Sequence, residues 1–191
     1  YSPEGIEHIE GETKAFIQRC VDKMGNDFLA NVGTANVVRD MDAMRAAVGD
    51  EKLTYLGYSY GTRIGSAYAE TFPDKVRAMI LDGAVDPNAD PIQADIDQAR
   101  AFQQAFNDYA KSPDCPLGTD PAKAVDVYRS MVDPLVDKPA PTADPRGLAY
   151  SDAIVGTIMA LYSPNLWRHL TQGLAELSHG RGDTMLALAD M

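Results

Sequence analysis

The feature that most constrains the fold is a strand-like run that passes straight into a glycine-framed serine and then into a helix. Residues 53–56 read Leu-Thr-Tyr-Leu, residues 57–61 read Gly-Tyr-Ser-Tyr-Gly, and residues 63–72 have helix-forming composition. A Phe-Pro-Asp stop signal follows, and residues 76–83 give a second buried-strand pattern. Strand, turn, helix and strand in such a short span predict a βαβ unit of a parallel sheet.

The serine of this turn is the candidate nucleophile. The G-x-S-x-G pattern between a strand and a helix is a nucleophile elbow, in which a tight, strained turn projects the hydroxyl of Ser59 into the open. In an elbow, the backbone N–H of the next residue, Tyr60, is one of two donors to an oxyanion. The alternative is a chance glycine–serine turn in another kind of α/β protein.

The residues before the elbow predict two helices. Residues 1–11 read as a loop, residues 12–24 as a helix, and residues 34–48 as a helix with Thr34 as N-cap. We expect the second helix to cover one face of the sheet, with charged residues such as Asp42 and Arg45 on its solvated side.

Beyond Gly83 the pattern becomes wholly helical. Helices are expected over residues 91–111, 121–131, 151–162, 164–178 and 183–191, and three begin with a cap residue followed by proline. A linker rich in proline and aspartate, over residues 132–147, would let these helices move. The predicted architecture is α/β: a partial parallel-sheet core with the elbow over residues 1–89, and a helical lid or cap over residues 90–191.

Composition narrows the classes of partner. The 191 residues carry 17 basic and 28 acidic side chains, and the net charge of −11 disfavours nucleic acid and anionic membrane surfaces. No apolar run is long enough to span a bilayer, and no secretory signal is recognisable. The spacing of Cys20, Cys115 and the three histidines matches no metal site, so no metal or other cofactor is predicted. The two cysteines are compatible with one disulfide, free thiols or bridges to other segments.

The other members of a catalytic triad are not evident. Asp82 and Asp86 lie at the end of the second strand, a position where some enzymes with a serine elbow carry the acid of the triad. A structural role explains them better: Asp82 would bond backbone groups at the strand end, and Asp86 would begin a turn. His169 and His179 lie in a helical region without a preceding strand, and His8 precedes the serine. None of the three is a strong candidate for the base.

Three blocks in order resemble a known family. They are Val38 to Arg45, Gly57 to Thr62, and Ile80 to Pro87, and together they resemble the tripeptidyl aminopeptidase-like serine hydrolases of actinobacteria, especially mycobacterial cell-envelope members described as carboxylesterases or proteases. The resemblance implies an α/β-hydrolase fold, a secreted or envelope-associated enzyme, and a helical cap. It carries Ser59 over as nucleophile and Tyr60 as oxyanion donor, and it implies that the triad Asp and His lie outside these residues.

The expected function is hydrolysis of a peptide or ester substrate through an acyl-enzyme on Ser59. An aminopeptidase would also need carboxylates in the cap to hold the free amine of its substrate. The candidates are Asp95, Asp97, Asp152 and Glu176, and each of them is also explained as an ordinary surface charge. Phe106, Met159, Tyr162 and Trp167 are either lid surface or plain core. The alternative function is a catalytically incomplete fragment or homologue with a binding or scaffold role.

Overall fold

A computed structural model describes residues 2–118 and 120–191 and divides the chain into two units, Tyr1–Ala89 and Asp90–Met191. The elements of the first unit are α1 (Pro3–Met24), α2 (Asn26–Leu29), α3 (Thr34–Ala47), β1 (Leu53–Tyr58), α4 (Tyr60–Thr71), a 3₁₀ turn (Pro73–Lys75) and β2 (Val76–Asp82).

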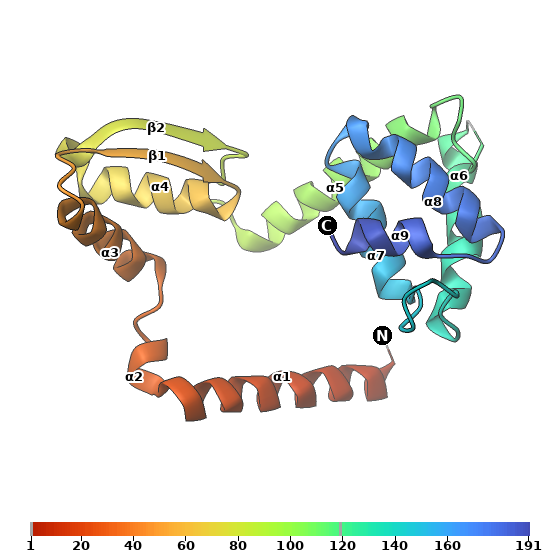
Figure 1. Ribbon diagram of the computed structural model, residues 1–191, viewed down its shortest axis with the longest axis horizontal. Coiled ribbons are helices and arrows are strands. Elements are labelled where there is room, and N and C mark those ends of the chain that lie inside the picture. Colours follow the sequence, from red (N-terminus) through yellow and green to blue (C-terminus); the bar gives the residue numbers. More distant parts are fainter. Residues whose placement is uncertain (1, 119) are drawn as a thin grey trace. The chain divides into compact units, whose positions relative to one another are not determined.

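The predicted βαβ unit is confirmed. The strands β1 and β2 pair in parallel, with Gly57 opposite Leu81 and Tyr58 opposite Asp82. Helix α4 runs along one face of this pair (Figure 1), where Gly57 is buried. On the other face Leu56 and Ile80 are exposed, since no element of the described chain covers them within this unit.

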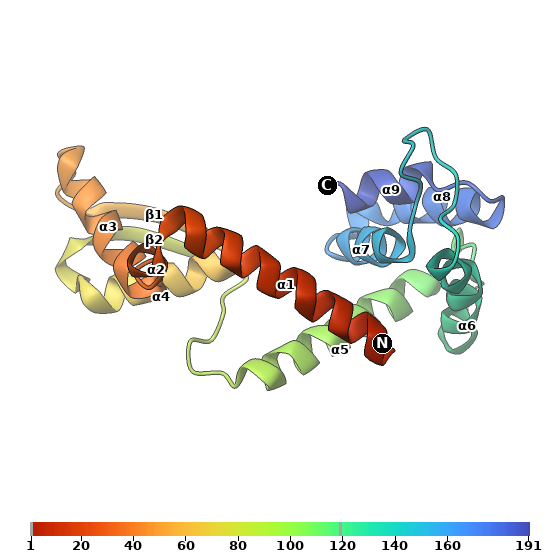
Figure 2. The same cartoon turned by 90° about the horizontal axis from the view of Figure 1, so that it is seen from below.

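The prediction of a loop over residues 1–11 is wrong, because α1 already begins at Pro3. Ser2 caps it by accepting a hydrogen bond from the N–H of Gly5 at 3.1 Å, and Pro3 occupies the first turn. This is the cap-plus-proline start that the sequence showed more clearly in later helices. Figure 2 shows α1 as one continuous rod leading to α2, and none of its residues is buried.

Helix α3 packs chiefly on α4, whereas the sequence predicted that it covers the sheet. Val38 is buried at this contact, whereas Met44 and Val48 of the same apolar pattern are exposed. The expected solvated face also differs. Asp42 accepts hydrogen bonds from Arg45 Nε at 2.7 Å and from the Tyr68 hydroxyl at 2.9 Å, so these charges join α3 to α4.

The second unit is helical, as predicted. Its elements are α5 (Pro91–Ala110), α6 (Pro121–Val132), a 3₁₀ turn (Asp133–Val136), α7 (Tyr150–Leu161), a 3₁₀ turn (Pro164–Leu166), α8 (Trp167–Ser178) and α9 (Asp183–Ala189). The three cap residues act as expected: Asp90, Asp120 and Ser163 each accept a hydrogen bond from a backbone N–H of the following turn. Helix α9 packs against both α7 and α8 (Figures 1 and 2).

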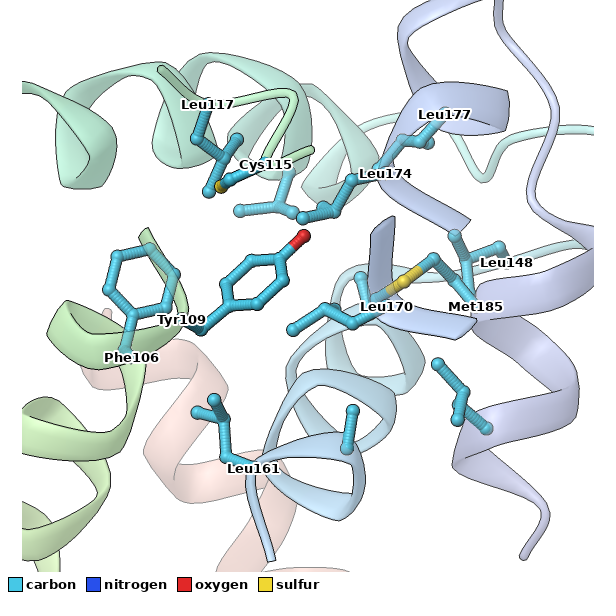
Figure 3. Close-up of a cluster of buried hydrophobic side chains, with 14 of the residues drawn as sticks. Phe106, Tyr109, Cys115, Leu117, Leu148, Leu161, Leu170, Leu174, Leu177 and Met185 are labelled. Carbon is cyan, nitrogen blue, oxygen red and sulfur yellow. The ribbon is translucent and has the colours of Figure 1, made fainter. Parts of the chain in front are cut away.

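A cluster of buried side chains holds these helices together (Figure 3). Tyr109 lies at its centre and is fully buried, with its ring 5.8 Å from that of Trp167 and its hydroxyl 3.1 Å from Thr171 Oγ1. Leu170 and Leu174 of α8 are also fully buried in the cluster. This cluster supplies the second unit with its own hydrophobic core.

The linker predicted over residues 132–147 begins with the end of α6 and the 3₁₀ turn Asp133–Val136, and the rest of it is tied to the second unit at two places. Ala140 pairs with Leu148 through two backbone hydrogen bonds of 2.9 Å, and both residues are buried. The loop is also attached to the start of α9, since Asp183 accepts a bond from the Ala143 N–H at 2.6 Å. The segment is therefore anchored to the hydrophobic core of the second unit, whereas the sequence predicted that it lets the helices move.

Among the described residues, no helix is long and apolar enough to cross a lipid bilayer.

Candidate functional site

Ser59 lies between the end of β1 and the start of α4, and its side chain is exposed. Its backbone has φ 49° and ψ −121°, and it is the one non-glycine residue of the described chain with a positive φ. Such a conformation costs about 1–3 kcal/mol and persists only where the surroundings impose it. Ser59 is the N-cap residue of α4, yet its side chain makes no capping bond, so the hydroxyl is left for another partner.

Glycines allow β1 and α4 to approach closely around this turn. A Cβ on Gly57 would lie 2.6 Å from the carbonyl oxygen of Gly61, and a Cβ on Gly65 would lie 2.8 Å from Tyr55 Cε1. The Tyr55 hydroxyl donates to the Gly61 carbonyl at 2.8 Å. Strand and helix are thus in contact through backbone atoms, which any larger residue at Gly57 would separate.

The backbone of Ser59 is held on both sides. Its N–H donates to the carbonyl of Asp82 at 3.1 Å, and its carbonyl accepts from the N–H of Thr62 at 2.9 Å. The Thr62 hydroxyl also donates to the Ser59 carbonyl, at 2.6 Å, and accepts from the Val85 N–H at 2.9 Å. The residues after β2 are therefore bonded directly to the turn that carries the serine.

Thr62 is a residue that sequence reasoning missed. The only signal was its position directly after the G-x-S-x-G pattern, at the third residue of α4. Thr62 is buried, with 1% of the residue exposed. Nothing in the local sequence pattern shows from which distant N–H its hydroxyl accepts a hydrogen bond.

Tyr60 begins α4, directly after the serine. The first N–H groups of a helix have no partner within the helix and bear partial positive charge, which suits them to a developing anion. The Tyr60 side chain has a separate position: its hydroxyl is 2.7 Å from Thr34 Oγ1, and the Arg63 guanidinium lies 5.9 Å from the ring centre. The backbone role of Tyr60 remains a prediction.

The acidic residues after β2 are occupied locally. Asp82 contributes its backbone carbonyl to the Ser59 N–H, and Asp86 accepts a hydrogen bond from the Asn88 N–H at 2.8 Å. The second contact is the turn expected of an Asp-Pro sequence. Neither carboxylate is hydrogen-bonded to a histidine in the described part of the chain.

The candidate histidines are bonded within their own helices. Nε2 of His169 is 3.3 Å from Arg168 Nε, and Nδ1 of His179 is 2.8 Å from the Ala175 carbonyl, at the C-terminal end of α8. His8 lies on the exposed surface of α1. No histidine hydrogen-bonds to the Ser59 hydroxyl among the described residues.

Three of the four candidate carboxylates of the second unit have structural partners. Asp97 pairs with Arg100 at 2.8 Å, and Asp152 accepts from the Ala149 N–H at the start of α7. Glu176 accepts from the Thr184 N–H at 3.1 Å. Asp95 is exposed and lines a cavity.

This cavity, of about 580 Å³, lies among α5, α6 and α7. Aromatic residues form much of its wall: Phe102, Phe106, Tyr128 and Tyr162. The Tyr128 hydroxyl is 2.9 Å from Thr157 Oγ1, and burial raises the pKa of Tyr128 to about 12, so it stays neutral at ordinary pH. Phe106 therefore belongs both to the core and to the cavity wall, whereas Trp167 packs on Tyr109.

Within the described ranges, no group of three or more His, Cys, Asp or Glu side chains is placed to hold a metal ion. Cys20 and Cys115 are both free thiols, the first half-buried on α1 and the second buried in the cluster around Tyr109.

Comparison with known proteins agrees with this architecture. The chain is 72% identical to serine protease Hip1 of Mycobacterium tuberculosis over the whole of this chain and 39% of that protein. It is 57% identical to carboxylesterase B of the same species, again over the whole chain and 38% of that protein. A tripeptidyl aminopeptidase of Streptomyces lividans is 42% identical over 50% of this chain and 18% of its own length.

The chain thus spans about two fifths of the length of the mycobacterial relatives. A family model for the alpha/beta hydrolase fold matches residues 11–180, a range that includes both the elbow and most of the helical unit. The chain belongs to the α/β hydrolase fold family.

Proposed function

We propose that the natural protein containing these residues is a serine hydrolase that cleaves peptide or ester bonds through an acyl-enzyme on Ser59. The observation that carries the proposal is the exposed Ser59 hydroxyl on a strained turn at the start of α4. Relatives named as a serine protease, a carboxylesterase and a tripeptidyl aminopeptidase support a reaction at an acyl carbon.

The proposed reaction begins when the Ser59 oxygen attacks the carbonyl carbon of the substrate and a general base accepts its proton. The carbonyl oxygen gains negative charge, which the Tyr60 N–H would stabilise as a hydrogen-bond donor. The base and its acidic partner are proposed to come from residues outside this chain, as is the second oxyanion donor. The protonated base then gives its proton to the leaving amine or alcohol as the C–N or C–O bond breaks, which leaves an ester on Ser59, and water hydrolyses this ester to release the acid and free Ser59.

The second unit is proposed to be the cap of the enzyme. Its own buried cluster and its division from the first unit at Asp90 support an inserted helical element. The aromatic-walled cavity offers apolar surface of the kind that small-molecule sites use. An exported or cell-envelope location stays a prediction.

A fluorophosphonate probe tests the proposal on the natural full-length protein. We expect rapid labelling of the wild type and none of Ser59→Ala. Ser66→Ala is the matched control, because Ser66 lies on the same helix and only donates to the Thr62 carbonyl at 3.0 Å. A wild type that is folded but unlabelled would contradict the proposal and favour a binding or scaffold role.

Peptidase and esterase activities are separated by substrate. Fluorogenic tripeptide amides and short acyl esters should be compared on the same preparation, with Ser59→Ala as the blank. Cleavage of both substrate classes is expected of an acyl-enzyme mechanism with a peptidase cap. Cleavage of esters alone would refute the peptidase part of the proposal.

A further inference from the structure

We infer that the Thr62 hydroxyl is a positioning group for the nucleophile: by bridging the carbonyl of Ser59 and the N–H of Val85, it fixes the direction of the Ser59 side chain. The inference rests on the proposed function, since positioning matters only if Ser59 attacks a substrate. Thr62 itself contacts the backbone of Ser59, so it would act through the nucleophile and not on the substrate.

The roles of the two hydrogen bonds follow from their chemistry. The Val85 N–H can only donate, so at 2.9 Å the Thr62 oxygen accepts from it. A hydroxyl has a single proton, and at 2.6 Å this proton points to the Ser59 carbonyl, which can only accept. Both capacities of the hydroxyl are therefore used, and its orientation is determined.

The bridge acts on the peptide group that follows Ser59. This carbonyl belongs to the residue whose backbone has φ 49° and ψ −121°, a conformation that does not persist without restraint. The Thr62 N–H holds the same oxygen from within the turn, whereas the hydroxyl connects it to residues after β2. Because the rotation of this peptide group sets ψ of Ser59, loss of the bridge would let the turn relax.

Gly83 supports the same arrangement. It has φ 67°, and a Cβ at this position would lie 3.8 Å from the Ser59 N, so the chain after β2 bends back immediately beside the elbow. The Asp82 carbonyl accepts the Ser59 N–H at the same place. The segment from Asp82 to Val85 thus holds the N–H side of Ser59 directly and the carbonyl side through Thr62.

An exposed threonine of the same helix shows what an ordinary helical hydroxyl does. Thr71, on the same helix, donates only to the Ala67 carbonyl one turn earlier and is exposed. Thr62 differs from Thr71 because it is buried and because its hydroxyl accepts from the N–H of Val85, 23 positions further along the chain. Thr71→Val is therefore a matched control that makes the same chemical change on α4 without touching the elbow.

The test compares Thr62→Val, Thr62→Ser and Thr71→Val in the natural full-length protein, with Ser59→Ala as the blank. We expect the second-order rate of fluorophosphonate labelling to fall about tenfold or more in Thr62→Val, because small misplacements of a reacting group are costly. Thr62→Ser keeps the bridge and should stay within about threefold of wild type, and Thr71→Val should match wild type. With an ester substrate, Thr62→Val should lower kcat and leave KM unchanged.

The outcomes separate the two proposals. If the wild type is not labelled, the proposed function fails. If the wild type is labelled and folded Thr62→Val is labelled at the same rate, the positioning role is wrong while the proposed function stands. A variant that only loses folded protein, with unchanged kcat per labelled site, would likewise overturn the positioning role.

If Thr62→Val does not fold, the bridge is tested from its other end. Val85→Pro removes the N–H that donates to Thr62, and Val85→Ala is its control, since residue Val85 is 37% exposed. Slower labelling in the proline variant alone supports the bridge, and equal labelling of both variants refutes it.

Discussion

Replacing Gly57 with alanine should both destabilise the first unit and slow the reaction of Ser59. The new Cβ would lie 2.6 Å from the Gly61 carbonyl oxygen and 2.7 Å from its carbon, whereas ordinary contacts begin at 3.4 Å. Strand β1 and helix α4 must therefore separate by about 0.8 Å, because the two Gly61 atoms belong to the backbone and cannot rotate aside, and Tyr55 Cε1 lies as close, at 2.7 Å. Overpacking of this kind costs about 2–3 kcal/mol. Because Ser59 lies between Gly57 and Gly61, the same movement displaces the side chain of Ser59, the proposed nucleophile.

The free energy of unfolding is measured by urea denaturation, and the reactivity of the serine by fluorophosphonate labelling. Gly11→Ala is the control: it lies within α1, a Cβ there meets nothing within 4 Å, and alanine should stabilise the helix by up to about 1 kcal/mol. The free energy of unfolding of Gly65→Ala should lie between those of Gly57→Ala and Gly11→Ala, since its Cβ meets side-chain atoms of Leu81 and Tyr55 that can move. If Gly57→Ala unfolds at the wild-type urea concentration and is labelled at the wild-type rate, close backbone packing does not hold the elbow.

Three further predictions concern strain, acid stability and the second unit. Ser59→Gly should be more stable than Ser59→Ala by about 1 kcal/mol in urea denaturation, because glycine tolerates the positive φ that both other residues find strained; equal stability would show that the turn is not strained. The hydrogen bond from Arg45 lowers the pKa of Asp42 in the folded protein below the ordinary aspartate value. The ionised Asp42 therefore stabilises the fold fully at pH values above the ordinary pKa, and this stabilisation is lost as the pH falls through the lowered pKa of the folded protein. The stability advantage of wild type over Asp42→Asn should thus be constant above about pH 5 and shrink below about pH 4, and an advantage that persists unchanged in acid would contradict this. Gly156→Ala should cost about 2–3 kcal/mol, because its Cβ would lie 2.5 Å from the Met185 carbonyl oxygen and push α7 from α9; an unchanged urea midpoint would refute it.

The sequence by itself determined the secondary-structure elements that depend only on residues close together in the chain. The strand–turn–helix around Ser59 could be predicted because strand-forming and helix-forming runs flank a turn whose glycines let strand and helix approach closely. The starts of α5 and α6 could be predicted from Asp90-Pro91 and Asp120-Pro121, because a helix cap involves residues at most three positions apart. The same signature at Ser2-Pro3 was present and marks the true start of α1.

Only the tertiary structure decided which groups meet across the chain. Helical periodicity showed that α3 has an apolar face, but it could not show that this face lies on α4, or that Asp42 meets Tyr68 at a separation of 26 residues. The bridge from Thr62 to Val85 is of the same kind, since a buried threonine hydroxyl accepts from whichever N–H the fold brings to it. Residue patterns specify the conformation of a segment and the polarity of its faces. The partner of each face depends on the path of the whole chain, which is why the strained serine turn was visible in the sequence and the contacts that hold it were not.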